Sequence, residues 1–359
     1  MFKLFKQKNN DNLKQLLIIR IDAIGDYILF RNFIEILKES EEYKDYKFTL
    51  LGNIIWKDLA ENLDDKWIDN FIWLDKNKLK TERKYRRCFE KIVDSLNYDI
   101  LLNPAYSREG FFLEPLISRI KATNKIAFSG DLVLMSGSQR FEENKKYTQL
   151  IESDKGIKFE FSRNKEFFEK LLNKEIEIKK PYINIQSNKN LIIDDYVIIF
   201  PGSQCEYKQW DIENYAKVAN YLIDKLNFKV VISGSKEDVK LAKSIISLIN
   251  IKNHIIDYTG KTSLRDIPDL FSTAKLILSG DTCAYHFAVA LNKKVICISN
   301  GYMLGRFLPY PEDIYADSIY IFSKALDRTS KNYIYGSMHN INTIDADQVI
   351  DAIKLNIKY

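Results

Sequence analysis

The fold is decided by a segment that reads Thr259-Gly260-Lys261-Thr262-Ser263-Leu264 and, twelve residues later, Leu276-Ile277-Leu278-Ser279-Gly280-Asp281-Thr282-Cys283-Ala284-Tyr285-His286-Phe287-Ala288-Val289-Ala290. The short apolar run that ends at Ser279 is typical of a strand covered on both faces of a parallel sheet. Gly280 breaks that strand, and Asp281 or Thr282 can cap the helix that follows. The pattern therefore predicts a turn, a helix, a buried strand, a polar turn and a second helix.

The polar turn between strand and helix is a candidate phosphate site. A helix that starts at the end of a buried strand leaves free N–H groups and the positive end of its dipole at the sheet edge. Asp281, Thr282 and His286 would surround that position. A plainer interpretation also fits these residues, because Asp281 and Thr282 can simply cap the helix while His286 packs beneath it.

Composition narrows the class of protein. A chain of 359 residues predicts two domains, and its net charge of +5 permits an anionic partner without indicating nucleic acid. The three histidines and four cysteines form no CxxC pair and have no metal-ligand spacing, so we predict no metal site. We find no signal peptide and no apolar run of about 20 residues, which predicts a soluble, cytoplasmic protein.

The N-terminal half opens with a strand, a glycine turn and a helix. Residues 16–21 are apolar except for Arg20, Gly25 lies in the turn, and residues 27–40 have helical spacing. This opening is typical of a doubly wound α/β domain, although the G-x-G-x-x-G dinucleotide fingerprint is absent. Asp26 either complements the helix dipole or acts as a base at the carboxyl end of the sheet.

A second α/β half follows a segment with little periodicity, residues 179–195. We expect domains at residues 1–185 and 186–340 and a final amphipathic helix within 341–359. In the second half we expect strands at residues 196–200, 228–233, 276–279 and 294–299, and polar side chains follow the first three of them. Lys208 supplies a point charge, and Ser203 and Thr282 supply hydroxyl donors, a set that suits a ligand with two phosphates.

Residues that would bind a second, acceptor molecule are marked less clearly in the sequence. A basic stretch over residues 76–91 is either a solvated helix face or a landing site for an anionic acceptor or lipid head groups. Acceptor candidates are Tyr106, Arg108, Arg86 and Arg87. The first fifteen residues mix apolar and basic side chains, which leaves contact with an anionic membrane surface open.

Four motifs carry a resemblance to a known family. The first two are Ile19-Arg20-Ile21-Asp22-Ala23-Ile24-Gly25-Asp26 and Pro201-Gly202-Ser203 with Lys208-Gln209-Trp210. The others are Tyr258-Thr259-Gly260-Lys261-Thr262-Ser263-Leu264 and Asp281-Thr282-x-x-x-His286-x-Ala288-x-Ala290, and all four resemble motifs of glycosyltransferase family 9, the heptosyltransferases. They stand in the family's order and span most of the chain. The resemblance implies a GT-B fold, in which two Rossmann-like domains face each other across a cleft and the last helix crosses back to the N-terminal domain.

The resemblance also implies a reaction. It is an inverting, metal-independent transfer from a nucleotide sugar, ADP-heptose in heptosyltransferases, to a bacterial lipopolysaccharide-core acceptor. By position, Asp26 matches the general base, Lys208 the donor-phosphate lysine and Asp281 the carboxylate at the donor sugar. The full set expected at the donor is Ser203, Gln204, Lys208, Ser235, Glu237, Asp281, Thr282, Cys283 and His286. The implied partners are a nucleotide sugar and an anionic glycolipid or glycan, with no nucleic acid, no cofactor, and contact with the cytoplasmic face of the inner membrane left open.

Two departures from the family pattern lie on the donor side. The family usually has glycine where this chain has Cys283, and glycine lets a backbone approach phosphate closely. The turn Asn300-Gly301-Tyr302-Met303-Leu304-Gly305-Arg306 also differs from the family's Phe-Gly-Pro type. Alternatives to a transferase are a GT-B sugar-nucleotide epimerase or hydrolase, and a non-catalytic relative that binds a sugar nucleotide or a partner.

Overall fold

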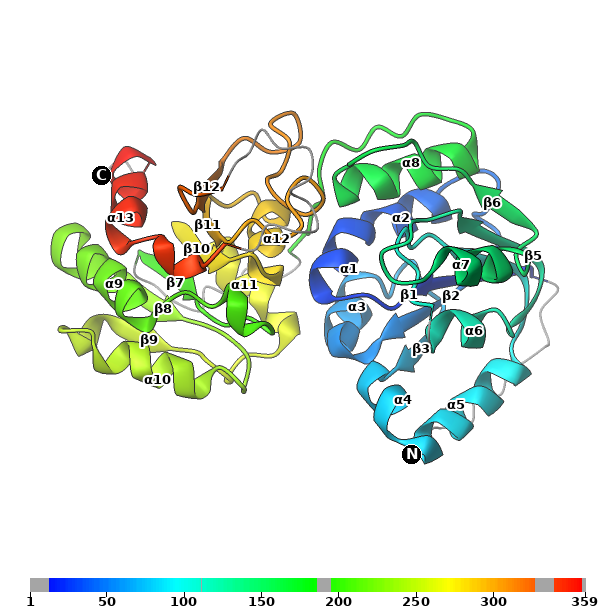
Figure 1. Cartoon of the computed structure of the whole chain (residues 1–359), viewed down its shortest axis with the longest axis horizontal. Coiled ribbons are helices and arrows are strands. Elements are labelled where there is room, and N and C mark those ends of the chain that lie inside the picture. The colour runs from blue at the N-terminus through cyan, green and yellow to red at the C-terminus, as the bar shows by residue number, and fades with distance from the viewer. Residues whose placement is uncertain (1–12, 111, 186–194, 327–338, 357–359) are drawn as a thin grey trace. The chain divides into compact units, whose positions relative to one another are not determined.

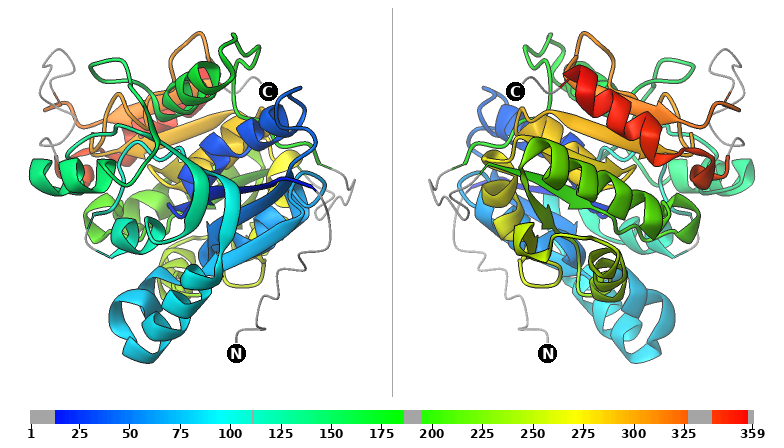
Figure 2. Two further views of the ribbon diagram at one scale, coloured as in Figure 1. Left: turned by 90° about the vertical axis from the view of Figure 1, so that its right-hand side faces the viewer. Right: turned by 90° about the vertical axis from the view of Figure 1, so that its left-hand side faces the viewer.

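A computed structural model describes residues 13–110, 112–185, 195–326 and 339–356 (Figure 1). The chain forms two compact α/β units, and Figure 2 shows the first in its left view and the second in its right view. The first unit comprises Met1–Gly156 and Phe161–Ile178, and the second comprises Ile157–Glu160 and Lys179–Tyr359. The predicted two-domain α/β architecture is confirmed. Most of the N-terminal tail for which membrane contact was left open, residues 1–12, lies outside the described residues.

The first unit is built on a parallel sheet of six strands in the order β3-β2-β1-β4-β5-β6. Its strands are β1 Gln15–Arg20, β2 Lys47–Asn53, β3 Asn70–Leu74, β4 Asn97–Asn103, β5 Lys121–Phe128 and β6 Gln149–Ile151. Its helices are α1 Ile24–Phe30, α2 Asn32–Lys38, α3 Lys57–Leu63, α4 Lys76–Thr81, α5 Arg83–Ser95, α6 Leu113–Ile117, α7 Gly137–Asn144 and α8 Glu160–Leu172, with the 3₁₀ turn η1 Ile54–Trp56.

The helix predicted over residues 27–40 is divided into α1 and α2 at Arg31. The guanidinium of Arg31 donates to the buried carboxylate of Asp64 at 2.6 Å, so the residue at the division is tied into the core. The sequence also predicts strands near residues 48–52, 99–104 and 125–128, which are present as β2, β4 and β5, whereas β3 and β6 were not predicted.

The second unit repeats the architecture, with its six parallel strands in the order β12-β11-β10-β7-β8-β9. Its strands are β7 Tyr196–Phe200, β8 Lys229–Ile232, β9 Ile255–Asp257, β10 Leu276–Gly280, β11 Val295–Ser299 and β12 Ser318–Phe322. Its helices are α9 Ile212–Leu226, α10 Val239–Ser247, α11 Ile267–Ser272, α12 Cys283–Ala290 and α13 Ala346–Asn356, with 3₁₀ turns η2 Glu206–Lys208, η3 Lys252–His254, η4 Leu264–Asp266 and η5 Ile341–Thr343.

Each sheet has a topological switch point beside its first strand. In the first unit β1 pairs with β2 on one side and β4 on the other, and in the second unit β7 lies between β8 and β10. Successive connections leave such a strand in opposite directions, which opens a crevice at the carboxyl ends of the strands, where open α/β sheets bind ligands. The turns that carry Asp26, Lys208 and Asp281 all follow strands at these two points.

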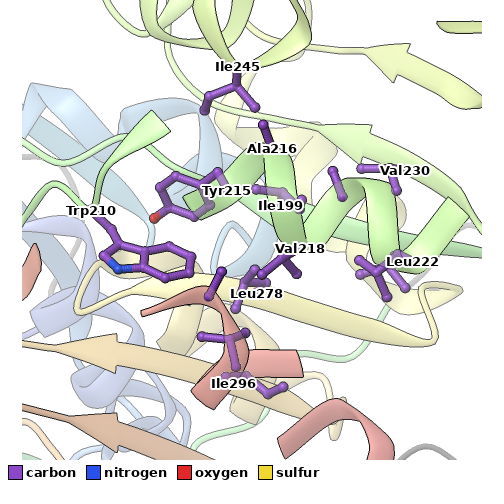
Figure 3. Packing of buried hydrophobic residues seen from close by; sticks show 14 of the residues in the cluster. Ile199, Trp210, Tyr215, Ala216, Val218, Leu222, Val230, Ile245, Leu278 and Ile296 are labelled. Atoms are coloured by element: carbon purple, nitrogen blue, oxygen red, sulfur yellow. The ribbon is translucent and has the colours of Figure 1, made fainter. Parts of the chain in front are cut away.

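The core of the second unit anchors one of those turns. Trp210 packs edge-on against Tyr215 of α9, with ring centroids 4.9 Å apart (Figure 3). The indole Nε1 of Trp210 donates to the carbonyl of Ile344 at 2.7 Å. Since Lys208 lies two residues before this buried ring, the end of η2 has little freedom to move away from the sheet edge.

The last helix packs on the core of the second unit. Helix α13 belongs to that unit, and its expected packing toward the N-terminal domain stays a prediction. Val349, Ile350 and Ile353 of α13 join the same apolar cluster as Trp210 and α9. The physical reason is the amphipathic pattern of α13, whose apolar face the second core buries. The division between the units also falls at residues 178 and 179, seven residues before the predicted boundary, and the Ile183 N–H donates to the Ala290 carbonyl within the second unit.

Candidate donor and acceptor sites

An ion pair occupies the switch point of the second unit. Lys208 Nζ donates to Asp281 Oδ2 at 2.6 Å, although the two residues come from turns after different strands, β7 and β10. The side chains are 17% and 8% exposed, so the pair is desolvated but not sealed. A mostly buried lysine at the carboxyl end of a parallel sheet, held beside a helix N-terminus, is suited to binding phosphate oxygens.

The turn after β10 leads directly into α12. Thr282 caps this helix, because its Oγ1 accepts from the Ala284 N–H at 3.3 Å, and it also contacts the Ser279 hydroxyl at 3.0 Å. The capping interpretation of Thr282 is thus confirmed, whereas the Asp281 carboxylate pairs with Lys208. Cys283 is the first residue of α12, and burial raises the pKa of its thiol to about 12, so the thiol stays neutral.

His286 lies under this turn, one helical turn into α12. It is buried, and its Nδ1 lies 3.0 Å from the Tyr310 hydroxyl. Burial, with a smaller contribution from the Lys208 charge, lowers the pKa of His286 to about 3. The imidazole is therefore neutral at physiological pH, and Tyr310 is its hydrogen-bond partner. Sequence reasoning missed Tyr310, which no motif marks.

The turn after β8 is organised by Asp238. The Ser235 N–H and hydroxyl both donate to Asp238 Oδ2 at 2.7 Å. A Cβ atom on Gly202 would lie 2.3 Å from the Asp238 carboxylate, so glycine is needed where the β7 turn meets the β8 turn. Glu237 is exposed, and hydrogen bonds to its own backbone and to Ser235 lower its pKa. Asp238 thus holds the turn, while the Glu237 carboxylate is accessible.

The remaining donor candidates lie in the turn after β7. Ser203 Oγ accepts from the Cys205 N–H at 3.3 Å, and the Ser203 carbonyl accepts from Gln209 Nε2 at 3.1 Å. Gln204 is exposed. The structure therefore brings Ser203 and Lys208 to the same turn, and strand pairing places this turn between those of Ser235 and Asp281.

Two tyrosines border the ion pair and were not predicted. The Lys208 ammonium lies 5.2 Å from the centre of the Tyr302 ring, and the rings of Tyr302 and Tyr207 pack edge to face at 5.9 Å. Asn300 Nδ2 donates to the Tyr207 carbonyl at 3.0 Å, which joins the turn after β11 to η2. The unusual Asn300-Gly301-Tyr302 turn was the available sequence signal.

Asp26 lies in the first turn of α1, at the switch point of the first unit. The buried Arg20, the last residue of β1, reaches Asp22 at 3.0 Å and Asp26 at 3.9 Å, and its Nη1 donates to Asn164 Oδ1 at 3.1 Å. Arg20 therefore keeps a fixed positive charge beside the proposed base. A lone arginine at the end of an apolar strand was the sequence signal for this role.

The structure corrects parts of the acceptor-side prediction. Arg108 is buried, where it pairs with Glu114, donates to Asn144 and lies over the Tyr147 ring, so it is not available to an acceptor. The chain needs that arginine to neutralise a buried carboxylate.

Arg86 is also occupied. Its Nε and Nη2 donate to the Leu79 and Lys80 carbonyls at the end of α4. Tyr106 is half-buried, with the Arg163 guanidinium over its ring at 4.2 Å. Arg87 is the most exposed of the four acceptor candidates, whereas Arg86 and Tyr106 are half-buried.

The described residues also bear on metal binding and on insertion into a membrane. In that part of the chain, no three His, Cys, Asp or Glu side chains are grouped as metal ligands would be. Over the same residues, no helix has the length and apolar character needed to cross a bilayer.

The sequence pattern of glycosyltransferase family 9 (heptosyltransferase) matches residues 89–319. Lipooligosaccharide heptosyltransferase 2 of Haemophilus ducreyi is 36% identical over 88 residues, which cover 24% of this chain and 25% of that protein. The lipopolysaccharide core heptosyltransferase OpsX of Haemophilus influenzae is 32% identical over 126 residues, 34% of each chain. The matches span about a quarter to two fifths of the length of the curated relatives.

Solved structures share the whole fold at low identity. The family 9 glycosyltransferase of Veillonella parvula has a TM-score of 0.73 at 19% identity and covers 95% of this chain and 96% of its own. The Escherichia coli heptosyltransferase WaaC, solved with ADP-2-deoxy-2-fluoro heptose, has a TM-score of 0.69 at 15% identity, with 96% and 100% covered. At these identities the likeness establishes the two-domain fold.

Proposed function

The chain belongs to glycosyltransferase family 9, and we propose that it transfers heptose from ADP-heptose to a lipopolysaccharide-type acceptor, with inversion and without a metal ion. The observation that carries the proposal is the Lys208–Asp281 pair at the switch point of the second unit, next to the N-terminus of α12. A donor diphosphate gains negative charge as the glycosidic bond breaks. A lysine and a helix N-terminus stabilise that charge without any metal.

Each donor-site residue has a separate role in this proposal. Lys208 and the first turn of α12 bind the diphosphate, and Asp281 contacts the sugar. The neutral His286, held by Tyr310, offers one ring N–H for a hydrogen bond without adding charge. Glu237 accepts from the ribose hydroxyls, a role supported by its exposure just after β8. Ser203, Gln204, Ser235, Thr282 and Cys283 complete the donor site in this proposal.

Asp26 acts as the general base. A sugar hydroxyl is a poor nucleophile, so a carboxylate must accept its proton as the new bond forms. Asp26 is partly exposed, and the guanidinium of the buried Arg20 lies 3.9 Å from its carboxylate. The acceptor is an anionic glycolipid or glycan, for which Arg87 is the accessible contact. We place the reaction in the cytoplasm, at the inner face of the membrane that holds such acceptors.

The test is a panel of ligands followed by a transfer assay. Thermal unfolding is measured with ADP, ADP-heptose, UDP, GDP and CMP, with and without EDTA. A ligand at about 100 times its dissociation constant stabilises the fold by about 2.7 kcal/mol. Stabilisation by ADP and ADP-heptose that EDTA does not change supports the proposal, and a response only to another nucleotide replaces the donor.

Turnover assays then distinguish a transferase from an epimerase, a hydrolase and a non-catalytic relative. Asp26→Asn should bind ADP-heptose as the wild type does and lose transfer, because the base is removed while the donor site is intact. Without any acceptor, release of ADP from ADP-heptose would instead indicate a hydrolase, and conversion to an epimeric sugar nucleotide would indicate an epimerase. Failure of all the nucleotides to bind would indicate a non-catalytic relative that binds a partner instead of a sugar nucleotide.

A further inference from the structure

An apolar segment projects from the first unit just before and within α7. Leu132, Val133, Leu134 and Phe141 are 61%, 41%, 50% and 63% exposed, four of the twelve large exposed hydrophobic residues in the described part of the chain. Three of them are consecutive. Isolated exposed apolar side chains are ordinary on a protein surface, but a contiguous group of this kind marks a surface that binds something.

The backbone beneath these side chains is anchored. The Gly110 N–H donates to the Leu134 carbonyl at 3.3 Å, and Arg140 donates to the Asp131 carbonyl at 2.6 Å. The buried Met135 packs against Gly110, where an added Cβ would come within 2.5 Å. The loop is therefore anchored to the unit through these bonds and the buried Met135, and its apolar side chains are exposed to solvent.

A basic face lies on α5 of the same unit. Its residues are Arg83, Lys84, Arg87 and Lys91, all exposed and spaced so that they share the side of the helix opposite the buried Phe89 and Val93. Within the described ranges these four residues form no ion pair. Their charge is therefore available to an anionic partner.

The two features belong to one side of the unit. Lys76 and Lys80 of α4 both pair with Glu109 at 2.9 Å, and the next residue, Gly110, bonds to the apolar loop at Leu134. Helix α5 follows α4 directly. Both views of Figure 2 show α4 and α5, in cyan, on the same side of the unit as the teal α6 and α7.

We propose that this docking face, the basic side of α5 together with Leu132, Val133, Leu134 and Phe141, binds the surface of a bilayer that contains anionic phospholipid. Basic side chains are attracted to anionic head groups, and neighbouring apolar side chains enter the boundary with the acyl chains. A second copy of this chain fits less well, because a two-fold contact would bring the basic face of each copy near the other. The inference does not require the transferase reaction, and vesicle binding is measured without substrate.

The first test is vesicle cosedimentation of the full chain, with phosphatidylcholine alone or with about one third phosphatidylglycerol. Binding should require the anionic lipid and fall at about 0.5 M salt, where screening extends only a few ångströms. Each basic residue near such a surface contributes about a fivefold gain in binding, so Lys84→Gln with Lys91→Gln should weaken binding about 25-fold. The matched control is Lys240→Gln with Lys243→Gln, two exposed lysines of α10 in the second unit, which should bind as the wild type does.

The second test removes the apolar contribution. Phe141→Ser should weaken vesicle binding about tenfold, because a phenyl ring no longer leaves water. Leu355→Ser on α13 is the control, since Leu355 is 82% exposed but lies outside the docking face. All four variants replace exposed residues, so their thermal unfolding should match that of the wild type.

Three results would overturn the inference. One is failure of the wild type to bind anionic vesicles at low salt. Another is equal binding by the docking-face variants and their controls. The third is a wild-type dimer in solution that Phe141→Ser dissociates while vesicle binding is unchanged, which would make a second copy the true occupant.

Discussion

Removal of the Lys208 ammonium separates a phosphate-binding role from a purely structural one. Lys208→Met keeps the length of the side chain and leaves the Asp281 carboxylate, 8% exposed, without its cation at 2.6 Å. Loss of one partner costs about 3–5 kcal/mol for a fully buried pair and under about 1 kcal/mol for an exposed one. With both side chains mostly buried, we expect about 2 kcal/mol of lost stability.

The effect on donor affinity is separate. A charge-assisted hydrogen bond from Lys208 to the diphosphate is worth about 1.5–3 kcal/mol, so ADP should bind about 10- to 100-fold more weakly to Lys208→Met. Asp281→Asn removes the competing carboxylate and should keep or raise ADP affinity, while sugar transfer falls. The double variant Lys208→Met with Asp281→Asn should recover most of the lost stability, because it leaves no unpaired charge.

The assays are urea unfolding and calorimetric titration with ADP. Lys261→Met is the matched control, because Lys261 also pairs with an aspartate of the second unit, Asp257, but at 3.7 Å and with 62% of its side chain exposed. That variant should change stability by less than about 0.5 kcal/mol and leave ADP binding unaltered. If Lys208→Met loses stability but binds ADP within about twofold of the wild type, the pair is structural and the donor assignment is wrong.

The other predictions concern three further positions. The pKa of His286, about 3 in the folded chain and about 6.5 when unfolded, means that acid protonates the unfolded chain first. Stability is then complete above pH 6.5 and is lost as the pH falls toward 3, by up to about 1.4 kcal/mol per unit. When urea midpoints are plotted against pH over this range, the wild type should therefore show a steeper fall than His286→Gln. Parallel plots would contradict this assignment. Gly202→Ala places a Cβ against the Asp238 carboxylate, so it should lower stability by about 1–2 kcal/mol and weaken ADP binding. A normal ADP affinity in calorimetric titration would show that the turn accommodates the added Cβ. Arg108→Met leaves Glu114 buried and unpaired and should destabilise the chain by about 3–5 kcal/mol in urea unfolding, whereas a neutral effect would restore Arg108 as an acceptor candidate.

Local patterns in the chain were enough to predict the α/β class and most of the strands. The apolar run before Gly280, the glycine turn before Asp26 and the capping residue Thr282 are signals that a few consecutive residues carry. Short strands were harder to predict. The three residues of β9 and the partly exposed β12 have too little apolar periodicity to be distinguished from loop.

The sequence therefore determined which turns carry polar chemistry, because strand ends, glycines and caps are read over short distances. Only the tertiary structure decided which side chains meet. Lys208 and Asp281 are 73 residues apart and become partners because β7 and β10 are neighbours in the sheet. Arg108 looked available in the sequence but is buried with Glu114, because burial depends on what packs over a residue rather than on its type.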